Sequence, residues 1–163
     1  MRHLKALYFL TFAAVGALTP FINLYLQRLG LSGGEIGIIS SMRPLATLIG
    51  PSLTVVLAAR LGAGNRALPV TMALAVLPSA LLYRTSGFAG LAAALFFLAL
   101  FQSPAPALLD DATLRGIDGT GQSYGRVRLW GSLGFIVAVY AVGVAAESYG
   151  FAAILAGNLV TVA

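Results

Sequence analysis

Long apolar runs separated by short polar links dominate this chain of 163 residues. About 20 residues of α-helix are needed to cross the roughly 30 Å hydrocarbon core of a bilayer, so runs of this length predict membrane-spanning helices. The pattern therefore predicts an all-α integral membrane protein with six helical segments. The expected segments are residues 4–26, 35–57, 67–82, 88–109, 124–146 and 151–163.

Local sequence features indicate where one expected helix begins and where the last one is cut. Ser32 and Glu35 have the spacing of a capping box, which marks the start of a helix. The run 151–163 stops at Ala163 without the charged or interfacial residues that usually close a spanning helix. We therefore expect the sequence to be cut within an incomplete sixth helix, with a second bundle absent.

Composition supports the membrane interpretation. Hydrophobic residues make up 59% of the chain and charged residues only 9%, whereas soluble domains carry roughly 25% charged residues. The net charge of +5 is spread through the links between apolar runs, which argues against nucleic-acid binding, because that needs basic residues gathered on one face. The chain has no cysteine, so it offers neither disulfides nor thiol ligands.

The basic residues also predict an orientation in the membrane. With the N-terminus in the cytoplasm, seven Lys and Arg residues fall on the cytoplasmic side and two on the opposite side. The positive-inside rule then predicts a cytoplasmic N-terminus. We expect a multi-pass protein of the cell (inner, cytoplasmic) membrane. The seven are Arg2, Lys5, Arg60, Arg66, Arg115, Arg126 and Arg128, and the two are Arg28 and Arg84.

Motifs of known catalytic sites are missing from the sequence. His3, near the N-terminus, is the only histidine, and no H-E-x-x-H, G-x-S-x-G or Walker phosphate loop occurs. We therefore expect a protein that is not an enzyme, with no cofactor and no metal site.

Polar residues inside the apolar runs are the candidates for a solute site. A charged group at the bilayer centre costs about 2.5–3.5 kcal/mol, so such groups usually face a bundle interior or a wet cavity and pair with another group. Arg128, Ser132 and Phe135 lie at i, i+4 and i+7 and share one helix face. Asp110, at the end of the fourth run, is the acid expected to pair with Arg128 across neighbouring helices.

Three further positions complete the candidate set. Thr19 and Asn23 fall on a polar stripe of the first run, and Arg43 stands beside a proline in the second. A proline-broken helix that carries a cation is a common way to build a transporter site. The residues alone leave alternatives open: Arg128 and Asp110 snorkelling to the headgroups, the stripe joining helices, and Arg43 binding a lipid headgroup.

Small residues follow the face of the fifth run that carries Arg128. Gly131, Gly134 and Ala138 would let a neighbouring helix approach closely. We therefore expect this run to pack tightly against another helix.

Three segments resemble the major facilitator superfamily, and within it the branch of lactose permease and phenylpropionate permease, often called MFS-1-like. They are TPFINLYLQRLGLSGGEIGII (residues 19–39), SPAPALLDDATLR (103–115) and YGRVRLWGSLGF (124–135). The resemblance covers nearly the whole chain and implies the N-terminal six-helix bundle of a twelve-helix fold, whose C-terminal six-helix half would be its partner.

The resemblance also implies a function. Such proteins are secondary active transporters of a small polar or aromatic solute, such as a sugar, a nucleoside or an organic acid. They work by alternating access within the lipid bilayer, usually with a proton as the coupling ion.

The resemblance extends to individual residues. In that branch an acid ending the fourth helix precedes an arginine of the fifth by eighteen positions, as Asp110 precedes Arg128. In lactose permease the matching pair contacts the sugar, and an aromatic residue at the position of Phe135 stacks on it. The resemblance thus implies that Asp110, Arg128 and Phe135 contact solute, while Arg126 remains with the headgroups.

The loop between the second and third helices departs from the family pattern. The family sequence commonly resembles L-A-D-R-x-G-R-R, and this chain has LAARLGAGNR, in which Ala59 replaces the aspartate and Ala63 a basic residue. Because the family's loop latches the inward-closed state, Arg60, Gly62 and Arg66 are expected gating residues of a weakened latch. Because of this departure, an alternative function remains: the protein could be a non-transporting relative that acts as an assembly factor or sensor.

Overall fold

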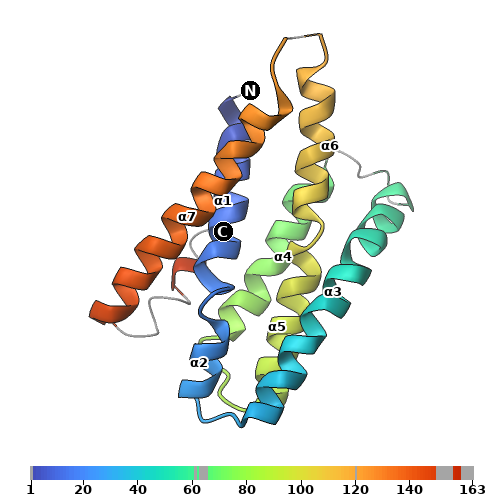
Figure 1. Cartoon of the computed structure of the whole chain (residues 1–163). Helices are drawn as coiled ribbons and strands as arrows, with labels where there is room; N and C mark the ends of the chain where they lie inside the picture. Colours follow the sequence, from blue (N-terminus) through green and yellow to red (C-terminus); the bar gives the residue numbers. More distant parts are fainter. Residues whose placement is uncertain (1, 61, 63–65, 120, 150–155, 159–163) are drawn as a thin grey trace. The chain divides into compact units, whose positions relative to one another are not determined.

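The structure, a computed structural model, describes residues 2–60, 62, 66–119, 121–149 and 156–158. All regular secondary structure in this part of the chain is helical (Figure 1), so the all-α class predicted from the sequence is confirmed. The helices are α1 (Arg2–Leu18), α2 (Ile22–Arg28), α3 (Gly33–Arg60), α4 (Ala67–Leu81), α5 (Phe88–Gln102), α6 (Ala105–Ile117) and α7 (Tyr124–Tyr149).

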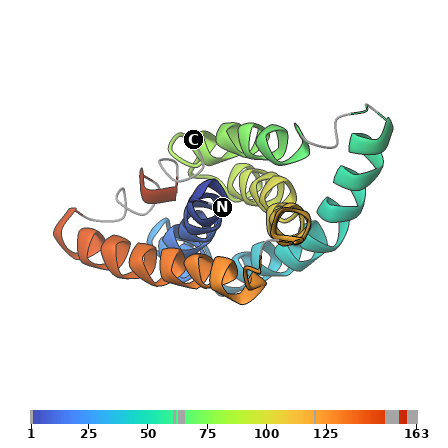
Figure 2. The ribbon, with the colours of Figure 1, turned by 90° about the horizontal axis from the view of Figure 1, so that it is seen from above.

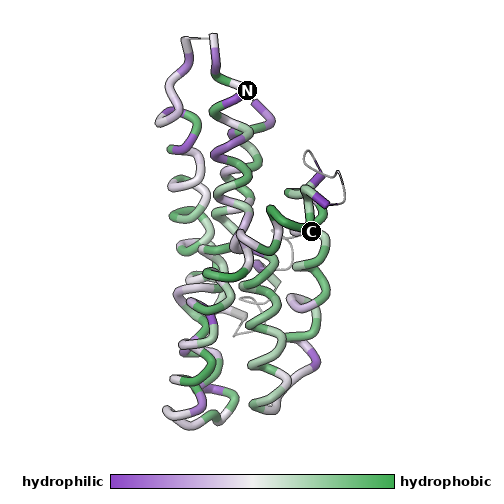
Figure 3. Tube along the Cα trace, turned by 90° about the vertical axis from the view of Figure 1, so that its right-hand side faces the viewer, coloured by the Kyte–Doolittle hydropathy of each residue, from purple (hydrophilic) through white to green (hydrophobic). Residues whose placement is uncertain are grey.

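Four helical stretches of the described chain are long and apolar enough to cross a membrane. They are Arg2–Arg28, Gly33–Arg60, Phe88–Ile117 and Tyr124–Ser148. Apolar colour extends along these stretches in Figure 3, and large apolar side chains remain exposed on them, such as Leu48 at 74%. A surface of this kind is suited to lipid, because soluble proteins rarely expose contiguous apolar patches of that size.

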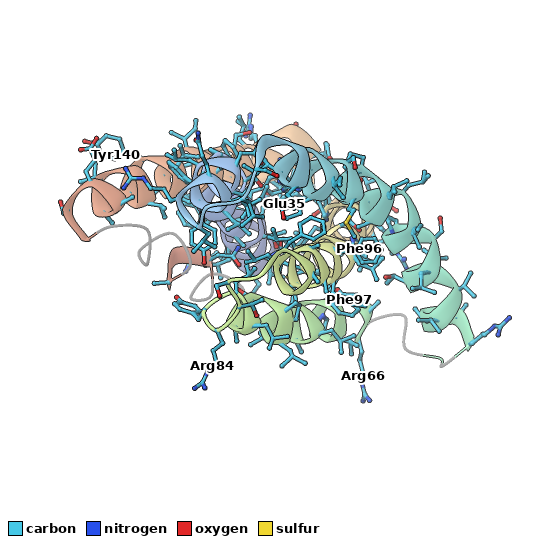
Figure 4. The ribbon with its side chains drawn as sticks, turned by 90° about the horizontal axis from the view of Figure 1, so that it is seen from below. Glu35, Arg66, Arg84, Phe96, Phe97 and Tyr140 are labelled. Atoms are coloured by element: carbon cyan, nitrogen blue, oxygen red, sulfur yellow. The ribbon has the colours of Figure 1, made fainter. Side chains whose placement is uncertain are left out.

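Helix α4 is shorter than the four long stretches. It has 15 residues, about 22 Å at 1.5 Å per residue, and Arg66 and Arg84 flank its two ends. Both arginines project away from the ribbon (Figure 4). The expected sixth segment, 151–163, lies outside the described residues apart from 156–158.

A proline divides the expected helix over residues 4–26. Helix α1 ends at Leu18 and α2 begins at Ile22, because Pro20 has no N–H to donate and its ring opposes a continuous helix. The chain therefore enters α2 through the turn at residues 19–21.

A second proline divides the expected helix over residues 88–109, between α5 and α6. Pro104 leaves the Leu100 carbonyl without its usual N–H partner four residues later. The Ser103 hydroxyl donates to that carbonyl instead, at 3.2 Å. The break thus costs less than a lost backbone hydrogen bond, since a buried carbonyl needs a donor.

Helix α3 begins with the predicted capping box. The Ser32 N–H and hydroxyl donate to Glu35 Oε2 at 2.8 and 2.7 Å, and the Glu35 N–H donates to Ser32 Oγ at 3.4 Å. This prediction is confirmed: the reciprocal bonds satisfy backbone donors that have no partner within the helix.

The chain divides into two compact units. Unit 1 comprises residues 1–20 and 106–162 and contains α1, most of α6, and α7. Unit 2 comprises residues 21–105 and contains α2 to α5.

In unit 1, α1 and α7 pack side by side along their length (Figure 1). They run in the same direction, because Lys5 near the start of α1 lies over the Trp130 ring while Gly16 near its end meets Phe135. The buried core of this unit includes Tyr8, Ala13, Ala14, Ala17, Leu109, Val127 and Ala138.

In unit 2, α5 packs against both α3 and α4 (Figure 2). A Cβ added at Gly50 of α3 would lie 2.5 Å from the Leu100 carbonyl oxygen, so α3 touches the backbone at the end of α5. The buried Tyr25 hydroxyl donates to the Leu82 carbonyl at 3.3 Å and ties α2 to the end of α4.

Candidate functional site

Arg128 extends inward along its helix instead of back toward the helix start. Its Cζ lies 4.0 Å from the centroid of the Phe12 ring and 5.7 Å from that of Tyr8. A Cβ added at Gly131 would lie 2.8 Å from Arg128 Nη1, so the guanidinium lies one turn further into the span than its own Cα. Snorkelling would require the opposite direction, toward the exposed Arg126 at the start of α7.

Asp110 of α6 accepts hydrogen bonds from two tyrosines. The hydroxyl of Tyr8 in α1 donates to Asp110 Oδ1 at 2.5 Å, and the hydroxyl of Tyr124 in α7 donates to the same oxygen at 2.9 Å. Tyr8 is fully buried. The carboxylate therefore joins three helices of unit 1 at one point.

The direct ion pair expected between Asp110 and Arg128 does not form among the described residues. Tyr8 contacts both groups, with its hydroxyl on the carboxylate and its ring beside the guanidinium. The ion pair of the described chain joins Arg115 to Asp111, four residues earlier on the exposed side of α6. Asp110 and Arg128 are thus linked through an aromatic ring and not by direct contact.

The close approach of α1 and α7 depends on the small residues singled out in the sequence. A Cβ at Gly134 would meet the Phe9 carbonyl oxygen and lie 2.8 Å from the Phe9 carbonyl carbon, and one at Gly131 would lie 2.8 Å from Phe12 Cδ2. Ala138 is also buried. The prediction that this face packs tightly against a neighbouring helix is confirmed, and the contact places the Phe12 ring beneath Arg128.

The remaining candidates of unit 1 lie near this pair of helices. Ser132 is exposed on α7, one turn beyond Arg128. Phe135 is half-buried, with ring atom Cδ2 3.2 Å from a Cβ added at Gly16. Thr19 is half-buried in the turn that follows α1.

Two candidates belong to unit 2. Asn23 on α2 is exposed, and its Oδ1 accepts a hydrogen bond from the Ser40 hydroxyl at 3.1 Å. Arg43 is half-buried within α3, next to Pro44. The Asn23 interaction is therefore a link between two helices of this unit.

The expected gating residues lie between α3 and α4. Arg60 is the last residue of α3, Gly62 has a φ of 62°, and Arg66 is exposed at the start of α4. The positive φ favours glycine at position 62, because side chains with a Cβ are strained there. Residue 61 and residues 63–65 lie outside the described part of the chain.

Sequence reasoning missed the aromatic partners of the site. Tyr8 and Phe12 are spaced i, i+4 on α1, and their rings stack with centroids 6.3 Å apart; this spacing was visible in the sequence. Their contact with Asp110 and Arg128 was not, because more than 100 residues separate them. Tyr124 stands at the first position of the segment 124–135 but was not among the residues expected at the site.

Thr113 adds an unexplained polar group beside Asp110. It lies three residues further along α6, so the two share a face. Thr113 is fully buried, and its hydroxyl lies near Tyr8 but makes no hydrogen bond of ordinary geometry to the described residues. No group of three or more His, Cys, Asp or Glu side chains that would suit a metal ion occurs among the described residues.

Comparison with known proteins identifies related sequences along the whole chain. Residues 1–163 match the model described as MFS_1 like family. A maltose permease of Geobacillus stearothermophilus is 39% identical over 153 residues, which cover 90% of this chain and 38% of the permease. A probable 3-phenylpropionic acid transporter of Escherichia coli (strain K12) is 29% identical over 160 residues, covering 95% and 41%.

A solved structure shares the fold. The crystal structure of the nucleoside transporter NupG matches 97% of this chain and 40% of its own length, with a TM-score of 0.83 at 18% identity. This confirms the membrane-transporter fold predicted from the sequence. The chain spans about two fifths of the length of these proteins.

Proposed function

Because the chain belongs to the MFS_1 like family, we propose that its protein is a secondary active transporter that works by alternating access. Its solute is a small polar or aromatic molecule: a sugar, a nucleoside or an organic acid. The proteins that this chain resembles support this range, since their names refer to maltose, 3-phenylpropionic acid and nucleosides.

The direction of Arg128 is the observation that carries the proposal. Its guanidinium lies over the Phe12 ring at 4.0 Å and beside Gly131, further into the span. A cation directed into a membrane segment is costly and usually marks a solute or ion path. Arg128 and Asp110 are thus the proposed centre of the solute site, with Ser132 and Phe135 on the same helix face as Arg128.

The wider arrangement of the proposed transporter follows from the sequence. A proton is the proposed coupling ion, and a C-terminal six-helix half is the proposed partner that completes the cavity. The protein is proposed to lie in the cell membrane with its N-terminus in the cytoplasm, because basic residues gather on that side. Thr19, Asn23 and Arg43 are proposed solute contacts, and Arg60, Gly62 and Arg66 a gate.

Uptake by cells that express the protein from its complete gene tests the proposal. Radiolabelled maltose, 3-phenylpropionate and uridine form the panel, and each variant is checked for its amount in the membrane. We expect Arg128→Gln and Asp110→Asn to lower uptake of the transported solute at least tenfold, whereas Arg126→Gln, two residues from Arg128, keeps it within about twofold. A tenfold loss corresponds to about 1.4 kcal/mol.

Two results would argue against this function. Uptake that survives both Arg128→Gln and Asp110→Asn would remove these residues from the solute site. No uptake of any panel solute by the unsubstituted protein, with normal membrane insertion, would favour the assembly factor or sensor.

A further inference from the structure

Tyr8 contacts both the acid and the cation of the site. Its hydroxyl donates to Asp110 Oδ1 at 2.5 Å, and Tyr124 donates to the same oxygen. The Tyr8 ring lies beside the Arg128 guanidinium, whose Cζ is 5.7 Å from the ring centroid. Because Tyr8 is fully buried, its side chain is held in place within unit 1.

This arrangement leaves the two charged groups with different partners. The carboxylate is engaged by two neutral hydroxyls. The guanidinium lies against the faces of Phe12 and Tyr8, and among the described residues neither a carboxylate nor a carbonyl accepts a hydrogen bond from it. Aromatic faces attract the positive charge, but they leave the five N–H donors of an arginine largely unused.

A carboxylate suits such an arginine better than a neutral group does. Its two oxygens match the planar fork of a guanidinium and form two parallel charge-assisted hydrogen bonds. The rings of Phe12 and Tyr8 lie beside the cation, so they can contact the apolar part of a solute whose carboxylate binds Arg128. Had Asp110 been paired with Arg128, the same site would present hydrogen-bonding groups with little net charge, which suit a neutral sugar.

We propose that Tyr8 is a positioning residue that prevents Asp110 from neutralising Arg128, so that the site selects solutes with a carboxylate on an apolar body. This inference rests on the proposed function, because it takes Arg128 to contact the solute. It narrows the solute to organic acids and assigns Tyr8 a role in selecting for charge.

A pair of matched ligands tests the proposal on the purified full-length protein. The probes are 3-phenylpropionate and its uncharged amide, 3-phenylpropanamide, which share one body and differ in charge. Equilibrium binding gives the ratio of their affinities. We expect the unsubstituted protein to bind the acid at least tenfold more tightly than the amide.

Two tyrosine variants separate positioning from packing. Tyr8→Phe keeps the ring beside Arg128 and removes the hydroxyl that holds Asp110, so the acid-to-amide ratio should fall at least fivefold. Tyr140→Phe removes the hydroxyl of an exposed tyrosine further along α7, which does not contact Asp110, and should leave the ratio within about twofold. A structural role alone would weaken the binding of both ligands together and leave the ratio unchanged.

Three outcomes would overturn the inference. They are a ratio near one in the unsubstituted protein, failure of that protein to bind the acid, and an unchanged ratio in folded Tyr8→Phe. The first two need no variant, so they apply even if Tyr8→Phe does not fold. The proposed function would survive each of them if uptake of another solute still required Arg128.

Discussion

Arg128 and Asp110 behave as a pair although they do not touch. The hydroxyl of Tyr8 donates to Asp110 and its ring lies beside Arg128, so one buried side chain contacts both groups. Spacing along the chain and the family resemblance predicted the two charged residues. They could not predict Tyr8 as the intermediary, because that contact arises only when α1 packs beside α6 and α7.

Thr113 provides a test of the hydrogen bonding around Asp110. Its buried hydroxyl lies near Tyr8 but makes no hydrogen bond of ordinary geometry to the described residues, and an unsatisfied buried polar group costs about 1–3 kcal/mol. Thr113→Val should therefore leave the free energy of unfolding unchanged or raise it by about 1 kcal/mol. Thermal unfolding of the purified protein in detergent measures the change.

A second buried threonine serves as the matched control. The Thr71 hydroxyl donates to the Leu68 carbonyl at 2.9 Å, so Thr71→Val loses a hydrogen bond and should cost about 1 kcal/mol. If Thr113→Val lowers the unfolding temperature as much as Thr71→Val does, the Thr113 hydroxyl has a partner and the description of this site is wrong.

At the scale of helices, hydropathy predicted where apolar segments lie but not where they break. Hydropathy predicted one continuous helix over residues 4–26 and another over 88–109. A single proline, Pro20 or Pro104, barely changes the hydropathy averaged over about 20 residues. A missing backbone N–H is a local effect, and it coincides with the breaks after α1 and α5, whereas Pro44 and Pro51 lie within the continuous helix α3. The capping box at Ser32 was predictable for the same reason: its hydrogen bonds are local and need only two residues at the right spacing.

The close contact of α1 with α7 predicts that a larger residue at Gly134 destabilises the protein. Gly134→Ala would place a Cβ against the Phe9 carbonyl, part of a backbone that cannot rotate away. The two helices would have to separate, and overpacking of this kind costs about 1–3 kcal/mol. We expect a lower unfolding temperature and, because Phe12 moves with α1, weaker binding of the solute.

The same helix supplies the control. A Cβ at Gly125 would come no closer than 3.7 Å to another group, Ser123 Oγ, and alanine is the better helix former by about 1 kcal/mol. Gly125→Ala should therefore be neutral or stabilising. Equal losses in the two variants would show that the close approach of α1 and α7 does not matter.

At the scale of the molecule, composition and the spacing of apolar runs predicted a helical membrane protein, and the family match over the whole chain agrees with that prediction. The sequence does not identify the solute, because an acid and an arginine can bind sugars, nucleosides and organic acids alike. Our proposal of an organic acid rests on the geometry within unit 1, where Arg128 faces aromatic rings and Asp110 faces hydroxyls. Such geometry depends on contacts between distant segments.

The central claim is that the Arg128 face of α7 borders a water-filled solute path. Residues 1–163 contain no cysteine, so single cysteines can be placed on α7 once any cysteine encoded elsewhere is replaced. Ser132 is exposed one turn from Arg128 and on its face, whereas Leu133 is 46% exposed on another face of the helix. The measurement is the labelling rate of Ser132→Cys and Leu133→Cys by a charged thiol reagent in membranes, with and without the transported solute.

We expect Ser132→Cys to react at least tenfold faster than Leu133→Cys, and the solute to slow its labelling. A thiol at position 132 that reacts no faster than one at position 133, or that solute fails to protect, would contradict the account.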